Sequence, residues 1–341
     1  MIVVHHPDQA LHDPEFVFRM GQFLPQPDRA ERYRIFLREA RKHASQVGEA
    51  PLGGMEPVLA VHDEGYVAFL ETVWQRWRAP PTAGPEVIPS VHPTPRMHRR
   101  PKDLLGELGW YSNSTSCPIG EGTYAAALAS AASAVHAADL LLAGGGPVYA
   151  LCRPPGHHAG HAFYGGYCFL NNAAVAAQSL RDGGAARVAV LDVDYHHGNG
   201  TQEIFWERGD VLFVSIHADP LDEFPYFCGH ADETGTGAGE GANLNLTLPW
   251  GTDWAGYAQA LAAAADRIRE FGADALVLSL GADTYGGDPI SRFRLLSEDF
   301  LRMGAAIAGI GLPTLFVMEG GYAVDDLGVN VANVLTGFAR A

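Results

Sequence analysis

The sequence predicts an α/β protein with a doubly wound, mostly parallel sheet and helices on both faces. Short apolar runs rich in Val, Leu and Phe, without polar alternation, are typical of strands that are buried on both sides. Long Ala-rich stretches lie between these runs, and most end near a glycine, as helices often do. The two kinds of segment alternate without an obvious linker, which indicates a single domain over residues 1–341.

The pattern gives a position for each main element. The expected strands, in chain order, are 148–152, 188–194, 211–217, 275–280 and 314–318. The expected helices between or beside them are 123–143, 171–182, 254–271 and 298–309. Three of these helices end near Gly144, Gly183 and Gly272, where we expect a residue in the left-handed conformation.

A Pro-rich insertion at about 79–118 interrupts the alternation. A loop of this length inside a compact domain is usually functional or disordered. Its centre, 104–111, is too apolar to be left in water. We expect this segment to pack against a neighbouring subunit and to form a homodimer; a loop folded over its own domain is the alternative.

The overall charge restricts the class of partner. Lys and Arg number 23 against 39 Asp and Glu, which gives a formal charge of −16. Such a surface repels nucleic acid and attracts cationic small molecules or basic peptides. The sequence shows no signal peptide and no run of about 18 apolar residues, and its four cysteines lack Cys-x-x-Cys spacing. We therefore expect a cytoplasmic protein that binds neither nucleic acid nor a membrane.

Several strand ends carry residues that can bind a metal. Asp194 and His196 are two positions apart where an apolar run ends, so their side chains point to the same side. Asp283 and the pair His157-His158 follow two other expected strands. Because the carboxyl ends of parallel strands meet at one edge of a sheet, these side chains are available for a catalytic zinc site with an open position.

Three segments resemble a known family. They are Pro-Pro-Gly-His-His at 154–158, Asp-Val-Asp-Tyr-His-His-Gly-Asn-Gly-Thr-Gln at 192–202 and Glu-Gly-Gly-Tyr at 319–322. Together they resemble the zinc-dependent histone deacetylase family and, within it, the bacterial acetylpolyamine amidohydrolases. The resemblance covers about residues 15–340 and implies a fold like that of arginases and deacetylases.

The resemblance implies a role for each residue of the centre. Asp194, His196 and Asp283 are expected to bind zinc; the same two carboxylates and one imidazole also suit Fe²⁺. His158 is expected to act as general base and acid, with His157 in a supporting role. Tyr322 is expected to polarise the carbonyl of the substrate.

A second set of residues is expected to support the first. Asp192 should pair with His157, and Asn199 should pair with His158. Since an amide cannot stabilise an imidazolium as a carboxylate does, we expect His158 to favour its neutral form. The resemblance also implies a structural K⁺ held with the help of Asp192 and Ser215.

The substrate channel is the least specific part of the prediction. Gly166, Tyr167 and Phe224 are expected to line a narrow channel around an aliphatic stem. The acidic candidates for binding a distal ammonium are Glu15, Asp103, Glu107 and Glu121. Leu105 and Ser116 stand where polyamine-specialised relatives carry carboxylates, which leaves short acetylated diamines as plausible substrates.

The leading hypothesis is thus a zinc amidohydrolase that deacetylates acetylated polyamines or short diamines, such as acetylputrescine, acetylcadaverine or acetylspermidine. One alternative is deacetylation of acetyllysine in a protein or peptide. A second is an arginase-like ureohydrolase with two Mn²⁺ ions, which Asp283 and Asp288-Pro289 faintly suggest. A third is an inactive sensor of acetylated amines, although no catalytic group is visibly missing.

Overall fold

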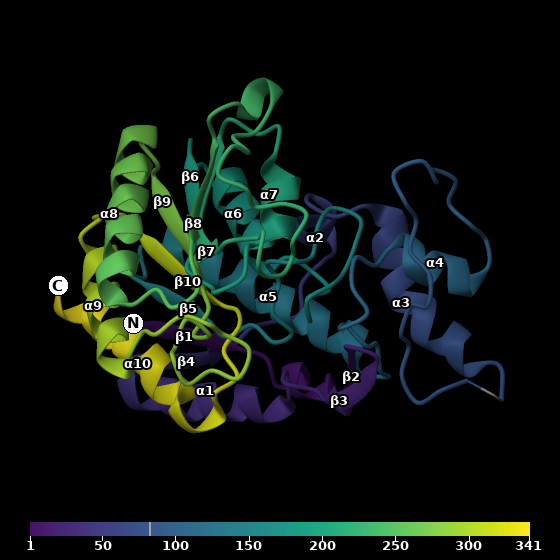
Figure 1. Ribbon diagram of the computed structural model, residues 1–341. Helices are drawn as coiled ribbons and strands as arrows, with labels where there is room; N and C mark the ends of the chain where they lie inside the picture. Colours follow the sequence, from purple (N-terminus) through teal and green to yellow (C-terminus); the bar gives the residue numbers. More distant parts are fainter. Residues whose placement is uncertain (82) are drawn as a thin grey trace.

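A computed structural model describes residues 1–81 and 83–341 (Figure 1). The main-sheet strands are β1 (Ile2–His5), β4 (Gln46–Glu49), β5 (Val148–Ala150), β6 (Val188–Asp192), β7 (Val211–Ala218), β8 (Asn243–Leu248), β9 (Ala275–Leu280) and β10 (Thr314–Met318). They form one eight-stranded sheet in the order β4-β1-β5-β10-β9-β6-β7-β8. Every neighbouring pair in it is parallel, so the predicted fold class is confirmed.

Helices cover both faces of this sheet (Figure 1). They are α1 (Ala30–His43), α2 (Glu56–Leu59), α3 (Glu64–Arg78), α4 (Leu104–Trp110), α5 (Thr123–Leu142), α6 (Asn172–Asp182), α7 (Asn199–Phe205), α8 (Trp254–Phe271), α9 (Ser297–Ala308) and α10 (Val324–Arg340). Helices α5 and α6 pack together on one face, whereas α1, α10, α9 and α8 form a continuous layer on the other. The main hydrophobic core lies between these layers.

The central strands are where the apolar runs predicted them. Every residue of β5, β6, β7, β9 and β10 is buried, as strands covered on both faces require. The prediction missed β1, β4 and β8 and the helices α1, α2, α3, α4, α7 and α10. It also missed a small antiparallel hairpin made by β2 (Phe16–Arg19) and β3 (Gln22–Pro25), which proves to lie beside the functional site.

The expected left-handed helix ends are correct at two positions and wrong at one. Gly144 and Gly272 have φ of +77° and +70°. Gly183 instead ends α6 with φ of −77°, and the left-handed residue is the next one, Gly184, at +105°. The helix ends at Asp182 as expected, but the left-handed residue follows one position later than predicted.

The Pro-rich insertion folds largely onto its own chain. Leu108 and Tyr111, in and just after α4, are buried in a second hydrophobic cluster with Tyr66 and Phe69 of α3. The expectation that segment 104–111 packs mainly against another subunit is therefore wrong for these two side chains. Leu105, on the same helix, is 52% exposed and remains available for an intermolecular contact.

Helix α5 is the one helix among the described residues that is long and apolar enough to cross a membrane by length and composition. It packs against β1, β5, β10 and α6, and 56% of its apolar window is buried inside the fold. This is how a core helix of a globular domain behaves, so its composition is weak evidence for a membrane span.

Candidate active site

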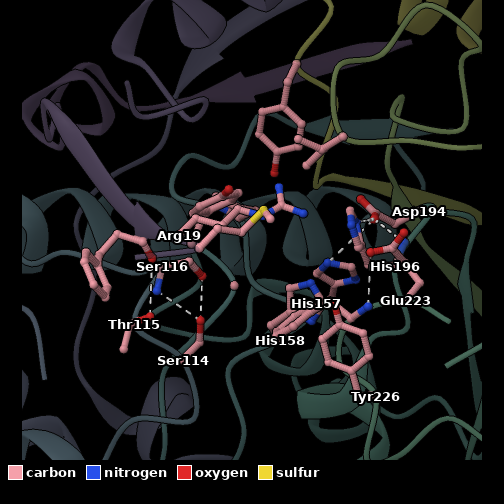
Figure 2. Close-up of a pocket in the computed structure, with 18 residues that line it drawn as sticks. Arg19, Ser114, Thr115, Ser116, His157, His158, Asp194, His196, Glu223 and Tyr226 are labelled. Atoms are coloured by element: carbon pink, nitrogen blue, oxygen red, sulfur yellow. Dashed lines mark hydrogen bonds and ion pairs between the residues drawn. The ribbon is translucent and has the colours of Figure 1, made fainter. Parts of the chain in front are cut away.

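The predicted metal and catalytic residues meet in a cavity of about 260 Å³ at the carboxyl edge of the sheet. Five strand-end loops converge there, following β5, β6, β7, β9 and β10. Figure 2 shows His157 and His158 in the middle of this cavity, between Asp194 and His196 on one side and Ser114 to Ser116 on the other. The complete lining is Phe18, Arg19, Met20, Ser114, Thr115, Ser116, Pro155, His157, His158, Gly166, Tyr167, Asp194, His196, Glu223, Phe224, Tyr226, Ile290 and Tyr322.

Asp194, His196 and Asp283 come together as a potential metal centre. One donor atom from each lies within 4.8 Å of the other two. His196 Nδ1 is 3.4 Å from Asp194 Oδ1 and 3.1 Å from Asp283 Oδ2. The backbone orients the carboxylates, because the amide of Gly320 donates to Asp194 at 2.8 Å and that of Tyr195 donates to Asp283 at 2.9 Å.

The electrostatics of these three residues favour a bound cation. Burial lowers the pKa of His196, but its hydrogen bonds to Asp194 and Asp283 and their charges outweigh that effect and raise it to about 10. Burial together with the charge of Asp194 raises the pKa of Asp283 to about 7. The group thus retains a proton when no other cation is bound, which is the behaviour of a site built for positive charge.

The two histidines after β5 differ in their charge state. Burial lowers the pKa of His157, but Asp192 and Asp194 raise it to about 10, and its Nδ1 lies 2.9 Å from Asp192 Oδ2. Burial and the neighbouring His157 and His196 hold the pKa of His158 well below 6.5. His158 Nδ1 instead lies 2.7 Å from the amide oxygen of Asn199. The structure therefore shows both expected pairings, with His158 as the neutral member.

Gly166 is required by close packing beside His158. Its φ is +52°, and a Cβ at this position would collide with the His158 ring. Tyr167, the next residue, also has positive φ and packs edge-on against Tyr322 with ring centroids 5.7 Å apart. The Phe224 ring lies edge-on to His158 at 4.9 Å. These three residues form the cavity walls that the sequence predicted.

Tyr322 stands at the remaining wall with its hydroxyl protonated. Burial raises the pKa of Tyr322 well above 10, with a smaller opposing effect of Arg32. The Arg32 guanidinium lies over the Tyr322 ring, 4.7 Å from its centroid. At neutral pH the phenol can therefore donate a hydrogen bond into the cavity.

The histone deacetylase domain matches residues 25–338 of this sequence. The chain belongs to the histone deacetylase family. It is 50% identical to acetylpolyamine amidohydrolase 2 of Pseudomonas aeruginosa, over 99% of this chain and 98% of that protein. It is 49% identical to the acetylpolyamine amidohydrolase of Mycoplana ramosa, over 99% of this chain and all of that protein. A crystal structure of acetylpolyamine aminohydrolase from Burkholderia pseudomallei superposes with a TM-score of 0.95 at 43% identity, covering 99% of this chain and 98% of that one.

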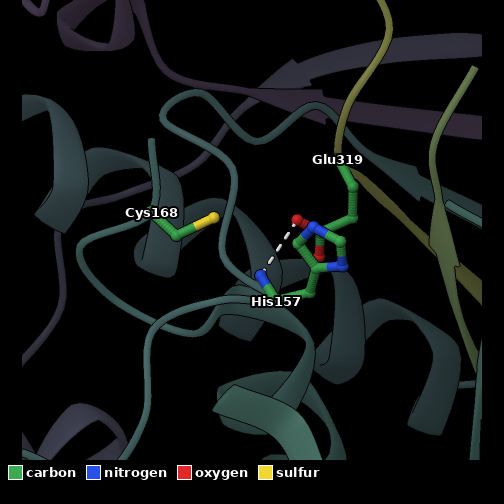
Figure 3. A group of neighbouring side chains, drawn as sticks. All are labelled: His157, Cys168 and Glu319. Carbon is green, nitrogen blue, oxygen red and sulfur yellow. Dashed lines mark hydrogen bonds between the residues drawn. The ribbon is translucent and has the colours of Figure 1, made fainter. Parts of the chain in front are cut away.

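This member of the histone deacetylase family has a second cluster of potential ligands behind the site, formed by His157, Cys168 and Glu319 (Figure 3). Glu319 Oε2 already accepts from the backbone amides of Gly156 and His157, at 2.7 and 3.1 Å. His157 Nδ1 faces Asp192, and burial raises the pKa of the Cys168 thiol well above 9. Because these groups are occupied or protonated, the cluster anchors the catalytic histidine turn and does not fit a metal.

The proposed acidic entrance is not formed by the predicted residues. Glu107 is buried, and its two oxygens pair with Arg76 and Arg100, so its charge is already neutralised. Glu15 and Glu121 are exposed but do not line the cavity. Asp103 caps the start of α4 by accepting from the Leu105 amide. Within the described chain, the prediction for Glu15, Glu107 and Glu121 is therefore wrong.

Several other residues line the cavity, and of these only Ser116 was named from the sequence. The hairpin β2–β3 brings Phe18, Arg19 and Met20 to the cavity, and Ser114 to Ser116 bring three hydroxyls. Among the described residues, Glu223 is the one glutamate in the lining, and it accepts from the Tyr195 hydroxyl at 3.0 Å. The side chain of Arg19 has no hydrogen-bond or ion-pair partner among the described residues. Apart from Ser116, these positions carried no recognised signal in the sequence, and the tertiary structure is what places them at the cavity.

Proposed function

We propose that this protein is a zinc-dependent amidohydrolase that removes the acetyl group from acetylated polyamines or short acetylated diamines. The observation that carries the proposal is the convergence of a three-ligand metal centre, a neutral histidine and a protonated tyrosine on one cavity. The names and full-length coverage of the curated relatives support the same reaction and substrate class.

The donor set fits a divalent cation. Two carboxylates neutralise its charge, one imidazole completes the protein ligands, and the cavity leaves room for water and substrate. Zn²⁺ is the expected metal from the family, and Fe²⁺ accepts the same ligands. When bound, the metal would act as a Lewis acid towards the amide carbonyl and lower the pKa of a water molecule to about 7.

His158 performs the proton transfers in the proposed mechanism. It is neutral near pH 7, so its free Nε2 can take a proton from the attacking water while Asn199 fixes the ring through Nδ1. The same nitrogen then delivers a proton to the departing amine. His157 cannot perform this step as easily, because Asp192 holds it in its protonated form.

Tyr322 stabilises the negative charge that develops on the carbonyl oxygen. Its hydroxyl remains protonated in the buried wall and is available as a donor. A donor aimed at a developing oxyanion contributes about 3 to 4 kcal/mol to the barrier reduction in well-studied hydrolases. Gly166, Tyr167 and Phe224 surround the aliphatic stem and thereby favour an unbranched acylated amine.

An arginase-like reaction with two metals is not supported. Asp288, the residue that suggested it, belongs to neither group of potential metal ligands among the described residues, and its oxygens accept the backbone N–H groups of Ile290, Tyr322 and Ala323. Among the described residues, the only other cluster of potential ligands is the anchored group around Glu319. Within the part of the chain that the structure describes, no further group of potential ligands is placed to hold a second metal ion at the site.

The remaining expectations form part of the same proposal. Asp192 and Ser215 are paired in register on β6 and β7 and would help hold a structural K⁺. Exposed Leu105 would contribute to a homodimer that narrows the entrance. We propose a cytoplasmic location and a small cationic acetylated amine as substrate, in keeping with the charge of −16.

The test is acetate release from acetylcadaverine by zinc-loaded enzyme, together with the zinc content of Asp194→Ala, His196→Ala and Asp283→Ala. We expect one zinc per chain and turnover in the wild type, and loss of both in each variant, because each change removes a ligand. Full zinc content in a purified variant would exclude that residue as an essential ligand. Absence of acetate release by fully loaded wild type would contradict the proposed function.

A further inference from the structure

Asp288 lies outside the three segments that resemble the family, yet it is hydrogen-bonded directly to the backbone of Tyr322. It is 6% exposed and stands in the loop after β9, five residues beyond Asp283. Its Oδ2 accepts from the amide of Tyr322 at 2.6 Å and from that of Ala323 at 3.1 Å. Its Oδ1 accepts from the amide of Ile290 at 3.0 Å. One carboxylate therefore connects the loop after β9 to the loop after β10.

The peptide bond that precedes Tyr322 is held at both ends. Asp288 accepts from the Tyr322 N–H, and Arg32 Nε donates to the Gly321 carbonyl at 2.7 Å. Gly321 itself has φ of +119°. Because glycine can adopt many backbone conformations, this residue alone does not hold the turn in the observed one. Without an acceptor at Asp288, the Tyr322 N–H would lose its partner inside the fold and the peptide could rotate.

We infer that Asp288 is a positioning residue that fixes the direction of the Tyr322 hydroxyl relative to the cavity wall. The inference rests on the proposed function, because it assigns Asp288 an effect through the oxyanion donor. Ile290 lines the cavity, so the Asp288 carboxylate holds the backbone of this wall residue together with that of Tyr322. The other residues that act on the substrate, His158 and the metal ligands, make no hydrogen bond to Asp288 among the described residues.

This geometry predicts a specific loss. Asp288→Ala should lower kcat by about 10- to 100-fold, because a displacement of about 1 Å in a catalytic group has effects of this size. KM should change much less, since Tyr322 acts mainly when the oxyanion forms. Asp288→Asn keeps the side-chain volume and one acceptor, so it should show a smaller loss and serves if the alanine variant does not fold.

A double-mutant cycle with Tyr322→Phe separates this role from a structural one. In the Tyr322→Phe background, Asp288→Ala should change kcat by less than about threefold, because the hydroxyl that it positions is already absent. Asp299→Ala is the matched control: Asp299 is also a buried carboxylate that accepts a backbone N–H, from Leu296 at 2.8 Å, but it caps α9. We expect that control to lower thermal stability without a Tyr322-dependent loss of kcat.

Each possible outcome decides the inference. A kcat loss that appears only when Tyr322 is present, with zinc content unchanged, supports it. Equal losses in both backgrounds, loss of zinc, or unchanged kcat for both Asp288 variants would overturn it. Failure of the proposed function itself is distinguishable, because zinc-loaded wild type would then release no acetate before any Asp288 variant is compared.

Discussion

Single residues decide which group in the cavity carries a proton. His157 and His158 are adjacent in sequence and their rings are 4.0 Å apart, yet their pKa values are shifted in opposite directions. The difference follows from their surroundings. Asp192 and Asp194 raise the pKa of His157, whereas burial and the neighbouring His157 and His196 lower that of His158. The neutral amide of Asn199, which faces His158, does not outweigh this effect. The neutral partner leaves His158 free to accept the proton of water.

Asn199→Asp should move the pH dependence of the reaction. A carboxylate beside His158 raises the pKa of that histidine, and His158 must be neutral to act as a base. The acid limb of the kcat/KM profile should therefore shift to higher pH, and activity should be lost earlier as pH falls. An unshifted acid limb in a well-folded, zinc-loaded Asn199→Asp enzyme would contradict the role of His158 as base.

Tyr322→Phe should keep substrate binding but lower kcat by about a hundredfold or more, because it removes the donor to the oxyanion. Steady-state kinetics with acetylcadaverine measures both parameters. Tyr167→Phe is a useful control, since that hydroxyl belongs to the neighbouring wall residue. Near-normal turnover by Tyr322→Phe would show that another group stabilises the oxyanion.

At the scale of elements, the strand ends were predictable and the entrance was not. The central strands are apolar runs without polar alternation, as burial on both faces requires. The carboxyl ends of parallel strands must meet at one edge of the sheet. That rule is enough to bring Asp194, His196 and Asp283 together. The entrance is built by the β2–β3 hairpin and the insertion, whose placement depends on long-range packing. β8 was missed because it carries two polar residues, Asn243 and Asn245, which are buried and donate hydrogen bonds to the side chain of Gln202.

The insertion gives an element-scale prediction about assembly. Leu105→Glu should convert the proposed homodimer to a monomer, because it places a charge on an exposed apolar side chain of α4. Light scattering coupled to gel filtration measures the change. Leu142→Glu, at the 43% exposed end of α5, is the control and should leave the assembly unaltered. A monomeric wild type, or a dimeric Leu105→Glu variant, would count against this interface.

Over the whole molecule, the net charge of −16 and a local cation at the entrance have opposite effects on a cationic substrate. The long-range field attracts cationic amines, whereas Arg19 lines the cavity as a guanidinium without a partner among the described residues. The long-range effect should weaken with salt, since the Debye length falls from about 10 Å at 0.1 M to about 3 Å at 1 M.

We therefore expect acetylcadaverine to exceed a neutral N-alkylacetamide of equal length in kcat/KM at low salt, with the ratio falling as salt rises. Arg19→Gln should increase the ratio, because it removes a repulsive charge near the distal ammonium. Arg340→Gln, at the end of α10, changes the same charge far from the entrance and should leave the ratio unchanged. A ratio of one at all salt concentrations would contradict selection by charge.

The most direct test of the central claim is a competition in one vessel. Zinc-loaded enzyme is given equal concentrations of acetylputrescine, acetylcadaverine, acetylspermidine and an acetyllysine peptide, and the disappearance of each is followed by mass spectrometry. The cavity and the family predict that acetylated diamines are consumed first, with acetate released in equal amount. Faster consumption of the peptide, or no consumption of any acetylated amine, would contradict the assignment as an acetylpolyamine amidohydrolase.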